Sequence, residues 1–166
     1  MTAPVVILAL VTLQRLAELA IARRNTKALL AGGAYEASPG HYPLIVAVHV
    51  GWLAALWWLA PGMPVSWSLI GLFLMLQLGR LWVLATLGRR WTTRIIVVPG
   101  ERFVARGPFR LVRHPNYLIV VGEIAVLPLA FGLWKMALLF TVLNAAVLVV
   151  RIRAEEKALA SAAASR

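Results

Sequence analysis

The chain contains no cysteine, and charged residues make up only 14% of its 166 residues. The absence of cysteine excludes disulfides, zinc-thiolate sites and a cysteine nucleophile, and it leaves the redox compartment undetermined. Hydrophobic residues reach 61%, mean hydropathy is +0.83, and seven tryptophans are present. This hydrophobic share exceeds that of ordinary soluble domains and is typical of an integral membrane protein. The length predicts a single domain, residues 1–166.

Two common signals are missing near the N-terminus. The apolar run from Met1 to Leu13 has no basic segment before it and no small-residue cleavage site after it. We therefore interpret it as part of a retained span and not as a signal peptide. The pair Gly32-Gly33 lacks the G-x-G-x-x-G spacing and the preceding strand of a dinucleotide-binding turn.

Five apolar segments approach the length of about 20 residues that a helix needs to cross a bilayer. They cover residues 3–22, 43–60, 66–87, 118–134 and 136–150. The last two are short and are joined by the turn Gly132–Lys135, which predicts a tilted or shallow hairpin. We therefore predict an all-α integral membrane protein of about five transmembrane helices. Residues 23–42 would form a polar loop, 88–117 a basic loop and 151–166 a polar C-terminal helix.

The distribution of positive charge supports this arrangement. Lys and Arg residues occur in 23–42, 88–117 and 151–166, which lie on one side of a membrane if there are five spans. Outside the spans, only Lys135 falls on the other side. The positive-inside rule makes the basic side cytoplasmic and places the N-terminus outside. This asymmetry also accounts for the net charge of +11, so we expect no nucleic-acid partner.

Several ionisable residues fall inside the spans. Arg15 and Glu18 are three residues apart, so they share a helix face and can pair. They mark either a helix end that extends to the lipid headgroups or a face directed into the bundle. Arg80 either extends to the headgroups or faces the bundle and holds a carboxylate or an anion. His49, alone in an apolar helix, is more often a hydrogen-bonded structural group than a ligand.

The basic loop contains the most polar passage of the chain, RGPFRLVRHPNY, at residues 106–117. Neither a buried core nor a lipid-facing helix uses this mixture, so we expect the passage to cap the bundle and form a binding site at the membrane boundary. Before it, Ile95–Val98 followed by Pro99-Gly100 predicts a short extended segment and a turn.

The C-terminal helix carries a second polar cluster. Asn144, Leu148, Arg151 and Glu155 lie on one helix face, and Arg151 and Glu155 have the spacing of an ion pair worth a few tenths of a kcal/mol on an ordinary solvated helix end. The predicted hairpin would bring this cluster back to the passage at residues 106–117.

The order of these motifs resembles a known family. RHPNY at 113–117, Glu123 with Pro128, Asn144, and RIRAEEKAL at 151–159 are similar to the C-terminal signature of the isoprenylcysteine carboxyl methyltransferase family. The resemblance begins near Leu78 and covers about half of the chain. The N-terminal half, with QRLAEL at 14–19, GAYE at 33–36, His41-Tyr42 and His49, is similar to a bacterial group that methylates alkylpyrones and alkylresorcinols.

The resemblance implies an S-adenosylmethionine-dependent O-methyltransferase in a bacterial inner membrane, with its cofactor on the cytosolic face and no metal. By position, the cofactor would be held by Leu111, Val112, His114, Tyr117 and Glu156. The implied catalytic residues are Arg113, Arg151 and Glu155; the arginines would orient the acceptor oxygen, and the carboxylates would face the sulfonium. The acceptor would contact Arg80, His41, His49, Glu123 and Asn144. The Ala/Ser-rich end after Ala158 departs from the family, whose tails carry aromatic residues that close over the cofactor.

The expected acceptor is lipophilic and enters from the bilayer: an alkylpyrone or alkylresorcinol, or a prenylated cysteine. A carboxylate is already ionised, whereas a phenol, with a pKa of about 10, would need a neighbouring arginine or a base such as His41 or His49. Two alternatives stay open. One is an NADPH-dependent membrane reductase, because some sterol reductases have a similar C-terminal arrangement. The other is a non-enzymatic scaffold whose basic loop binds anionic membrane lipid. The oligomeric state is undetermined.

Overall fold

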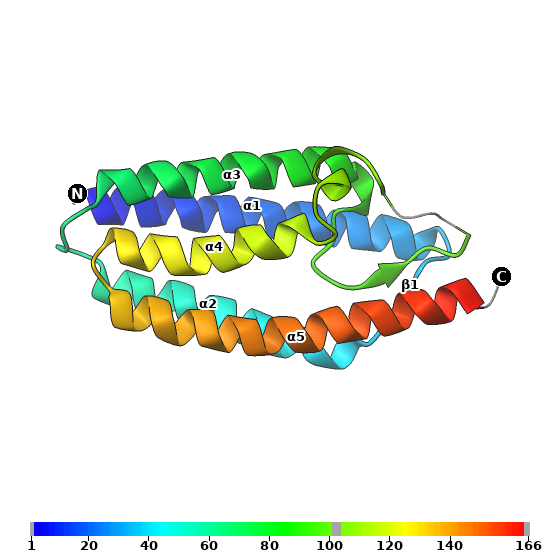
Figure 1. Ribbon diagram of the computed structural model, residues 1–166. Coiled ribbons are helices and arrows are strands. Elements are labelled where there is room, and N and C mark those ends of the chain that lie inside the picture. The colour runs from blue at the N-terminus through cyan, green and yellow to red at the C-terminus, as the bar shows by residue number, and fades with distance from the viewer. Residues whose placement is uncertain (1, 101–103, 165–166) are drawn as a thin grey trace.

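The computed structural model describes residues 2–100 and 104–164, with side chains up to Ala158. Five helices run alternately in opposite directions along one axis, so the two ends of the chain lie at opposite ends of the bundle (Figure 1). They are α1 Ala3–Ala31, α2 Tyr42–Leu59, α3 Trp67–Leu87, α4 Pro115–Ala130 and α5 Trp134–Ala164. Arg102 and Arg166, which belong to the predicted basic side, lie outside the described residues.

Four helical segments of the described chain are long and apolar enough to cross a membrane: Ala3–Ala31, Pro39–Leu59, Trp67–Arg90 and Trp134–Ala158. α4 is also apolar but has only 16 residues. Large apolar side chains such as Leu13, Leu78 and Leu138 are exposed on the outer faces, as expected where lipid replaces water. The predicted all-α membrane protein is confirmed, whereas the number of spans stays a prediction.

The predicted loop at residues 23–42 is wrong in its first half, because α1 continues to Ala31. No glycine or proline occurs between Arg23 and Ala31, so nothing in the sequence ends the helix at the point where its composition becomes polar. The helix ends at Gly32, and Gly33 follows with φ of +90°, a conformation that glycine adopts without strain. The first basic residues therefore lie on a helix.

The division of the C-terminal half also differs from the prediction. Residues 136–150 and 151–166 were expected to be a span and a separate polar helix, but α5 is continuous from Trp134 to Ala164. α4 begins at Pro115, three residues before the predicted span, and proline suits the first turn of a helix. The turn between α4 and α5 contains Gly132 at φ of +74°. The two helices pack against each other, so the predicted hairpin exists.

The core is divided along the bundle axis. A large apolar cluster, which includes Leu8, Leu56, Phe73, Leu127 and Phe131, fills the end near the N-terminus. A smaller cluster of Ala22, Val83 and Trp91 lies toward the other end. Between them the interior is polar.

α3 and α4 approach each other closely at two glycines. A Cβ added at Gly79 would lie 3.3 Å from Ile119, and one added at Gly122 would lie 2.9 Å from Leu76. Small residues at such positions allow membrane helices to pack with their backbones near one another. This contact places the side chains of α3 and α4 that flank the glycines within reach of each other.

A two-stranded antiparallel sheet connects the two loops at the C-terminal end of α1. β1, Tyr35–Glu36, pairs with β2, Ile96–Val97, and Tyr35 faces Val97 in the register. β2 confirms the extended segment predicted within residues 95–98. Because β1 follows α1 and β2 follows α3, the sheet holds residues 91–97 beside the start of α2.

Candidate active site

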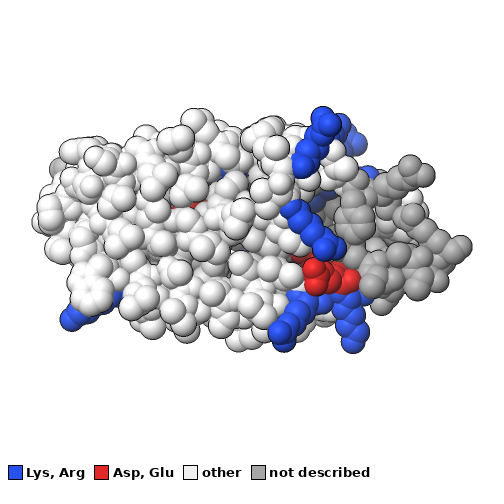
Figure 2. Space-filling model, viewed as in Figure 1, with Lys and Arg blue, Asp and Glu red and all other residues white. Residues whose placement is uncertain are grey.

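Lys and Arg side chains gather toward one end of the bundle, which we call the basic end (Figure 2). Lys135 lies in the first turn of α5, at the other end. The basic end comprises the C-terminal turns of α1 and α3, the described segments between α3 and α4, the start of α4 and the C-terminal part of α5. The chain reverses direction four times, so the polar residues of these segments meet there although they are far apart in sequence. The predicted convergence of the two polar clusters is confirmed.

Tyr117 is the centre of the contacts at the basic end. Its phenolic oxygen donates a short hydrogen bond to Oε2 of Glu155 and accepts one of 3.0 Å from Nε of Arg151. The direct ion pair predicted between Arg151 and Glu155 is absent among the described residues, because the phenol lies between the two groups. Tyr117, on α4, thus fixes the positions of an arginine and a carboxylate on α5.

Arg151 is also held from a second direction. Its Nη1 donates a hydrogen bond of 2.9 Å to the main-chain oxygen of Thr93. The Thr93 hydroxyl lies 3.1 Å from the hydroxyl of Tyr42, at the start of α2. Nη2 of Arg151 has no hydrogen-bond partner among residues 2–100 and 104–158. The guanidinium is therefore oriented by two contacts and keeps one nitrogen for an acceptor oxygen.

The RHPNY segment lies beside these residues. The rings of His114 and Tyr117 stack with centroids 5.1 Å apart and an angle of 16°. Arg113 is 78% exposed and approaches Glu156 at 3.7 Å. Nε2 of His114 and Oδ1 of Asn116 are buried and have no hydrogen-bond partner in the described part of the chain.

These unpartnered atoms bear on whether the residues suit S-adenosylmethionine. A buried polar atom without a partner costs free energy comparable to a lost hydrogen bond, so the buried Nε2 of His114 and Oδ1 of Asn116 favour a polar ligand at this place. Glu155 and Glu156 bring negative charge to the same end, as a sulfonium cation requires. Leu111 and Val112 are largely exposed and lie directly before this segment. The residues present therefore fit the cofactor that the sequence predicts.

A second polar group lies inside the bundle. Arg80 on α3 donates to Glu123 on α4 from both Nε, at 2.8 Å, and Nη2. Its Nη1 lies 3.3 Å from Glu18, and Arg15 bridges Glu18 at 2.8 Å and Glu123 at 2.9 Å. Arg80, Glu123 and Glu18 are all less than 10% exposed. The intramembrane cluster of Arg15, Glu18, Arg80 and Glu123 is therefore closed and electrically neutral.

The cluster settles the alternatives that the sequence left open. Arg15 and Glu18 form the predicted pair and face the bundle, and Arg80 holds carboxylates instead of extending to the headgroups. Glu123 was predicted from the family resemblance only as an acceptor contact, and in the structure it is an ion-pair partner. Gln14 was not predicted; it donates to Glu18 and Gln77, both at 3.0 Å, and a glutamine inside an apolar run is the signal that would have indicated it.

The remaining predicted acceptor residues lie apart from one another. Nδ1 of His49 lies 2.8 Å from the main-chain oxygen of Ile45 in its own helix, which agrees with a structural role. His41 is buried in the turn before α2, and neither ring nitrogen has a partner among the described residues. Asn144 is buried on α5, and its Nδ2 is likewise unpartnered there. The structure thus leaves buried polar atoms of His41 and Asn144 without a protein partner among the described residues, and their contact with an acceptor stays a prediction.

Thr93 and Tyr42 were missed by the sequence prediction as site residues. Tyr42 occurs in the His41-Tyr42 pair of the N-terminal resemblance, but no role was predicted for either residue, and both act through contacts between distant segments. Arg94 was counted only as a loop charge, but it binds both carboxylate oxygens of Glu36 at 2.8 and 2.9 Å and lies 4.5 Å from the ring centre of Tyr42.

Comparison with known proteins agrees with this arrangement. The model of the isoprenylcysteine carboxyl methyltransferase (ICMT) family matches residues 69–161, which include the basic loop, α4 and most of α5. The uncharacterized protein YpbQ of Bacillus subtilis is 39% identical over 158 residues, covering 92% of this chain and 94% of its own. An uncharacterized protein of Haemophilus influenzae is 31% identical over 151 residues, covering 87% and 88%. No solved structure matches the chain significantly.

Proposed function

Because this chain belongs to the isoprenylcysteine carboxyl methyltransferase family, we propose that it transfers the methyl group of S-adenosylmethionine to an oxygen of a lipophilic acceptor. The arrangement of Arg151, Tyr117 and Glu155 is the observation that carries this proposal. In this arrangement Arg151 is the cation that orients the acceptor oxygen, and Glu155 is the carboxylate that faces the sulfonium. Both lie at the boundary between the apolar helices and the basic end.

The chemistry requires positioning more than reactive groups. The acceptor oxygen forms a bond to the methyl carbon while the bond from that carbon to sulfur breaks, and the electron pair remains on sulfur as a neutral thioether. S-adenosylmethionine supplies the methyl group already activated by the positive sulfur. The protein therefore has to hold two reactants in line and exclude water.

Each residue of the basic end has a role in this scheme. Nη2 of Arg151 orients the acceptor oxygen and stabilises its negative charge. Glu155, fixed by Tyr117, faces the sulfonium together with Glu156. His114 and Asn116 bind polar groups of the cofactor, and Arg113 remains a catalytic candidate that moves inward from its exposed position. Leu111 and Val112 cover the cofactor.

The acceptor reaches this place from the bilayer. Exposed leucines cover the outer faces of the helices, whereas the basic end is polar, so a lipophilic acceptor and a polar cofactor approach from different phases. Of the acceptors that the sequence suggests, we favour a polyketide-type alkylpyrone or alkylresorcinol over a prenylated cysteine. We place the basic end on the cytoplasmic side of a bacterial inner membrane, with the N-terminus outside.

Calorimetric titration of the detergent-purified protein tests the proposal. We expect saturable binding of both S-adenosylmethionine and its demethylated product S-adenosylhomocysteine. Glu155→Gln and Glu156→Gln together should weaken binding of the positively charged cofactor by about tenfold and should change binding of the neutral product little, because only the former places a charge near the carboxylates.

Lys135→Gln, at the opposite end of the bundle, is the matched control and should bind both ligands normally. Equal weakening of both ligands by the Glu155 and Glu156 changes would show that these carboxylates do not face the sulfonium. If neither ligand bound and NADPH did, the chain would be a reductase and not a methyltransferase.

A further inference from the structure

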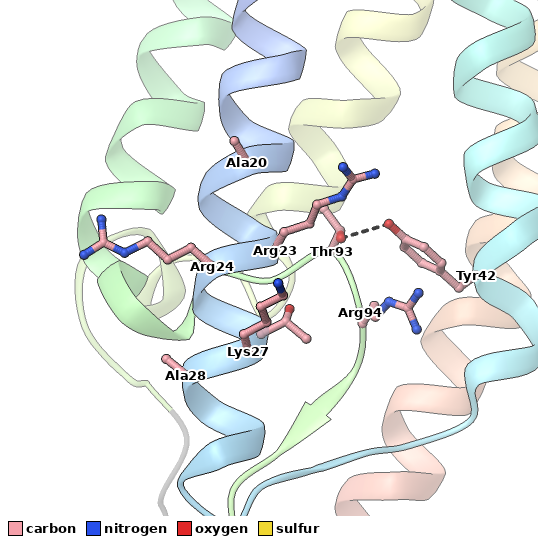
Figure 3. Close-up of a pocket in the computed structure, with 9 residues that line it drawn as sticks. Ala20, Arg23, Arg24, Lys27, Ala28, Tyr42, Thr93 and Arg94 are labelled. Atoms are coloured by element: carbon pink, nitrogen blue, oxygen red, sulfur yellow. Dashed lines mark hydrogen bonds between the residues drawn. The ribbon is translucent and has the colours of Figure 1, made fainter.

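A cleft of about 940 Å³ opens between the C-terminal half of α1 and the start of α2 (Figure 3). Ala20 and Ala28 line it on α1, and Tyr42 and Thr93 line the opposite side. It lies where the apolar part of α1 ends and the first basic residues begin. The cleft is thus at the depth of the lipid headgroups if α1 spans the membrane.

Cationic side chains dominate the lining of the cleft. Arg23 and Lys27 both line the cleft; Arg23 extends from α1 toward Thr93, while Arg24 projects to the other side of the helix (Figure 3). None of these three forms an ion pair with another described residue. Arg94 completes the lining, and its charge is already compensated by Glu36. Two exposed cations without an anion therefore face one cavity.

Apolar surface continues from the cleft toward the membrane interior. Leu16 and Ile21 on α1 and Leu44 and Val46 on α2 are exposed. A ligand that places an anionic group against Arg23 and Lys27 would therefore lay apolar chains along these two helices. Free phosphate has a matching charge but makes no use of this surface.

We propose that this cleft binds the phosphate headgroup of an anionic membrane phospholipid, with Arg23 and Lys27 as the phosphate ligands. Basic pockets between membrane helices at the cytoplasmic boundary suit such headgroups, because each Lys or Arg near an anionic surface strengthens the attraction to it. The Tyr42 hydroxyl adds a neutral hydrogen-bonding group. The proposal goes beyond methyl transfer and does not rest on it.

The cleft also adjoins Arg151 through Thr93. The side chain of Thr93 lines the cleft and bonds Tyr42, while its main-chain oxygen accepts a hydrogen bond from Arg151. A headgroup in the cleft would pack against the same segment that orients Arg151.

Native mass spectrometry of the full chain in detergent tests the proposal, with phosphatidylglycerol, phosphatidylcholine and inorganic phosphate as probes. We expect discrete adducts with phosphatidylglycerol, fewer with phosphatidylcholine, and no displacement of the lipid by inorganic phosphate at millimolar concentration. Arg23→Gln with Lys27→Gln should weaken phosphatidylglycerol binding by about tenfold or more.

The matched control is Arg89→Gln with Arg110→Gln, which removes the same charge from two exposed arginines outside the cleft. It should leave the adducts unchanged, and thermal melting should show that both double variants are folded. Equal loss in both variants would overturn the proposal in favour of non-specific attraction to a basic surface. Displacement by inorganic phosphate, or equal binding of both lipids, would overturn it as well.

Discussion

Arg80 and Glu123 form a two-pronged ion pair between α3 and α4, and both side chains are at most 5% exposed. The pair lies directly beside the close approach of the two helices at Gly79 and Gly122. A charge that far from water is costly unless it is paired. The bundle therefore depends on Glu123 and Arg80 being present together.

Removing one member of the pair should destabilise the protein more than removing both. Arg80→Met leaves Glu18 and Glu123 with Arg15 as their only cation and should cost about 3–5 kcal/mol. Arg80→Met with Glu123→Met leaves the neutral pair Arg15 and Glu18 and should cost less than either single change. Unfolding in detergent measures all three, with Arg89→Met as an exposed control. A double variant less stable than both single variants would contradict the closed, neutral cluster.

Tyr117→Phe should remove the group that orients Arg151 and Glu155 while the protein stays folded. The phenylalanine ring keeps the stacking on His114 but loses the hydrogen bonds to Arg151 and Glu155. If the chain is a methyltransferase, kcat should fall by about 100-fold, because a misplacement of about 1 Å in an active site has that effect. Cofactor binding should change much less, and methyl transfer from labelled S-adenosylmethionine in membranes measures the rate. An unchanged kcat would show that the phenol does not position the reacting groups.

Gly122→Val should disturb the contact between α3 and α4. Even the Cβ would lie 2.9 Å from Leu76, so Leu76 or the helices must move. Overpacking of this kind costs about 1–3 kcal/mol. Gly71→Val on α3 is the matched control, since a Cβ there meets no heavy atom within 4 Å. Similar melting temperatures for both variants would mean that the close approach is not required.

Asn25 tests the connection between α1 and the segment after α3. Its Nδ2 donates to the main-chain oxygens of Gly88 at 3.1 Å and Trp91 at 2.9 Å. Asn25→Asp keeps the shape but removes both donors, and it should cost about 1–3 kcal/mol because two carbonyls lose a partner. Limited proteolysis of residues 88–97 should become faster. The conservative change Thr26→Ser, at a half-buried position one residue further on, should leave proteolysis unaltered.

Local patterns predicted much of this structure. The spacing of Arg15 and Glu18 predicted one helix face, and a partner for Arg80 inside the bundle was one of the two alternatives that the sequence left open. Composition failed at residues 23–31, because a polar stretch was interpreted as a loop although it lacks any residue that ends a helix. The same error split α5 at Arg151. A membrane helix can therefore pass from lipid into water without ending, as α1 and α5 both do.

Contacts between distant segments could not be predicted from the sequence. Gln14 and Gln77 are 63 positions apart, and only the packing of α1 on α3 brings them together. Thr93 binds Arg151 through its main-chain oxygen, so its residue type carries no signal of that role. Motif spacing therefore located the RHPNY segment and α5, but the segment that connects them to α2 required the three-dimensional fold.

Because α5 is continuous, its length fixes the distance between Trp134 and Arg151. Trp134, whose ring is exposed and lies beside Lys135, suits one membrane interface, and Arg151 stands about 25 Å along the same rigid rod at 1.5 Å per residue. The height of Arg151 above the bilayer midplane is therefore set by helix length and not by loop conformation. A bilayer of longer acyl chains would draw this arginine toward hydrocarbon, so the surroundings of Arg151 would depend on membrane thickness.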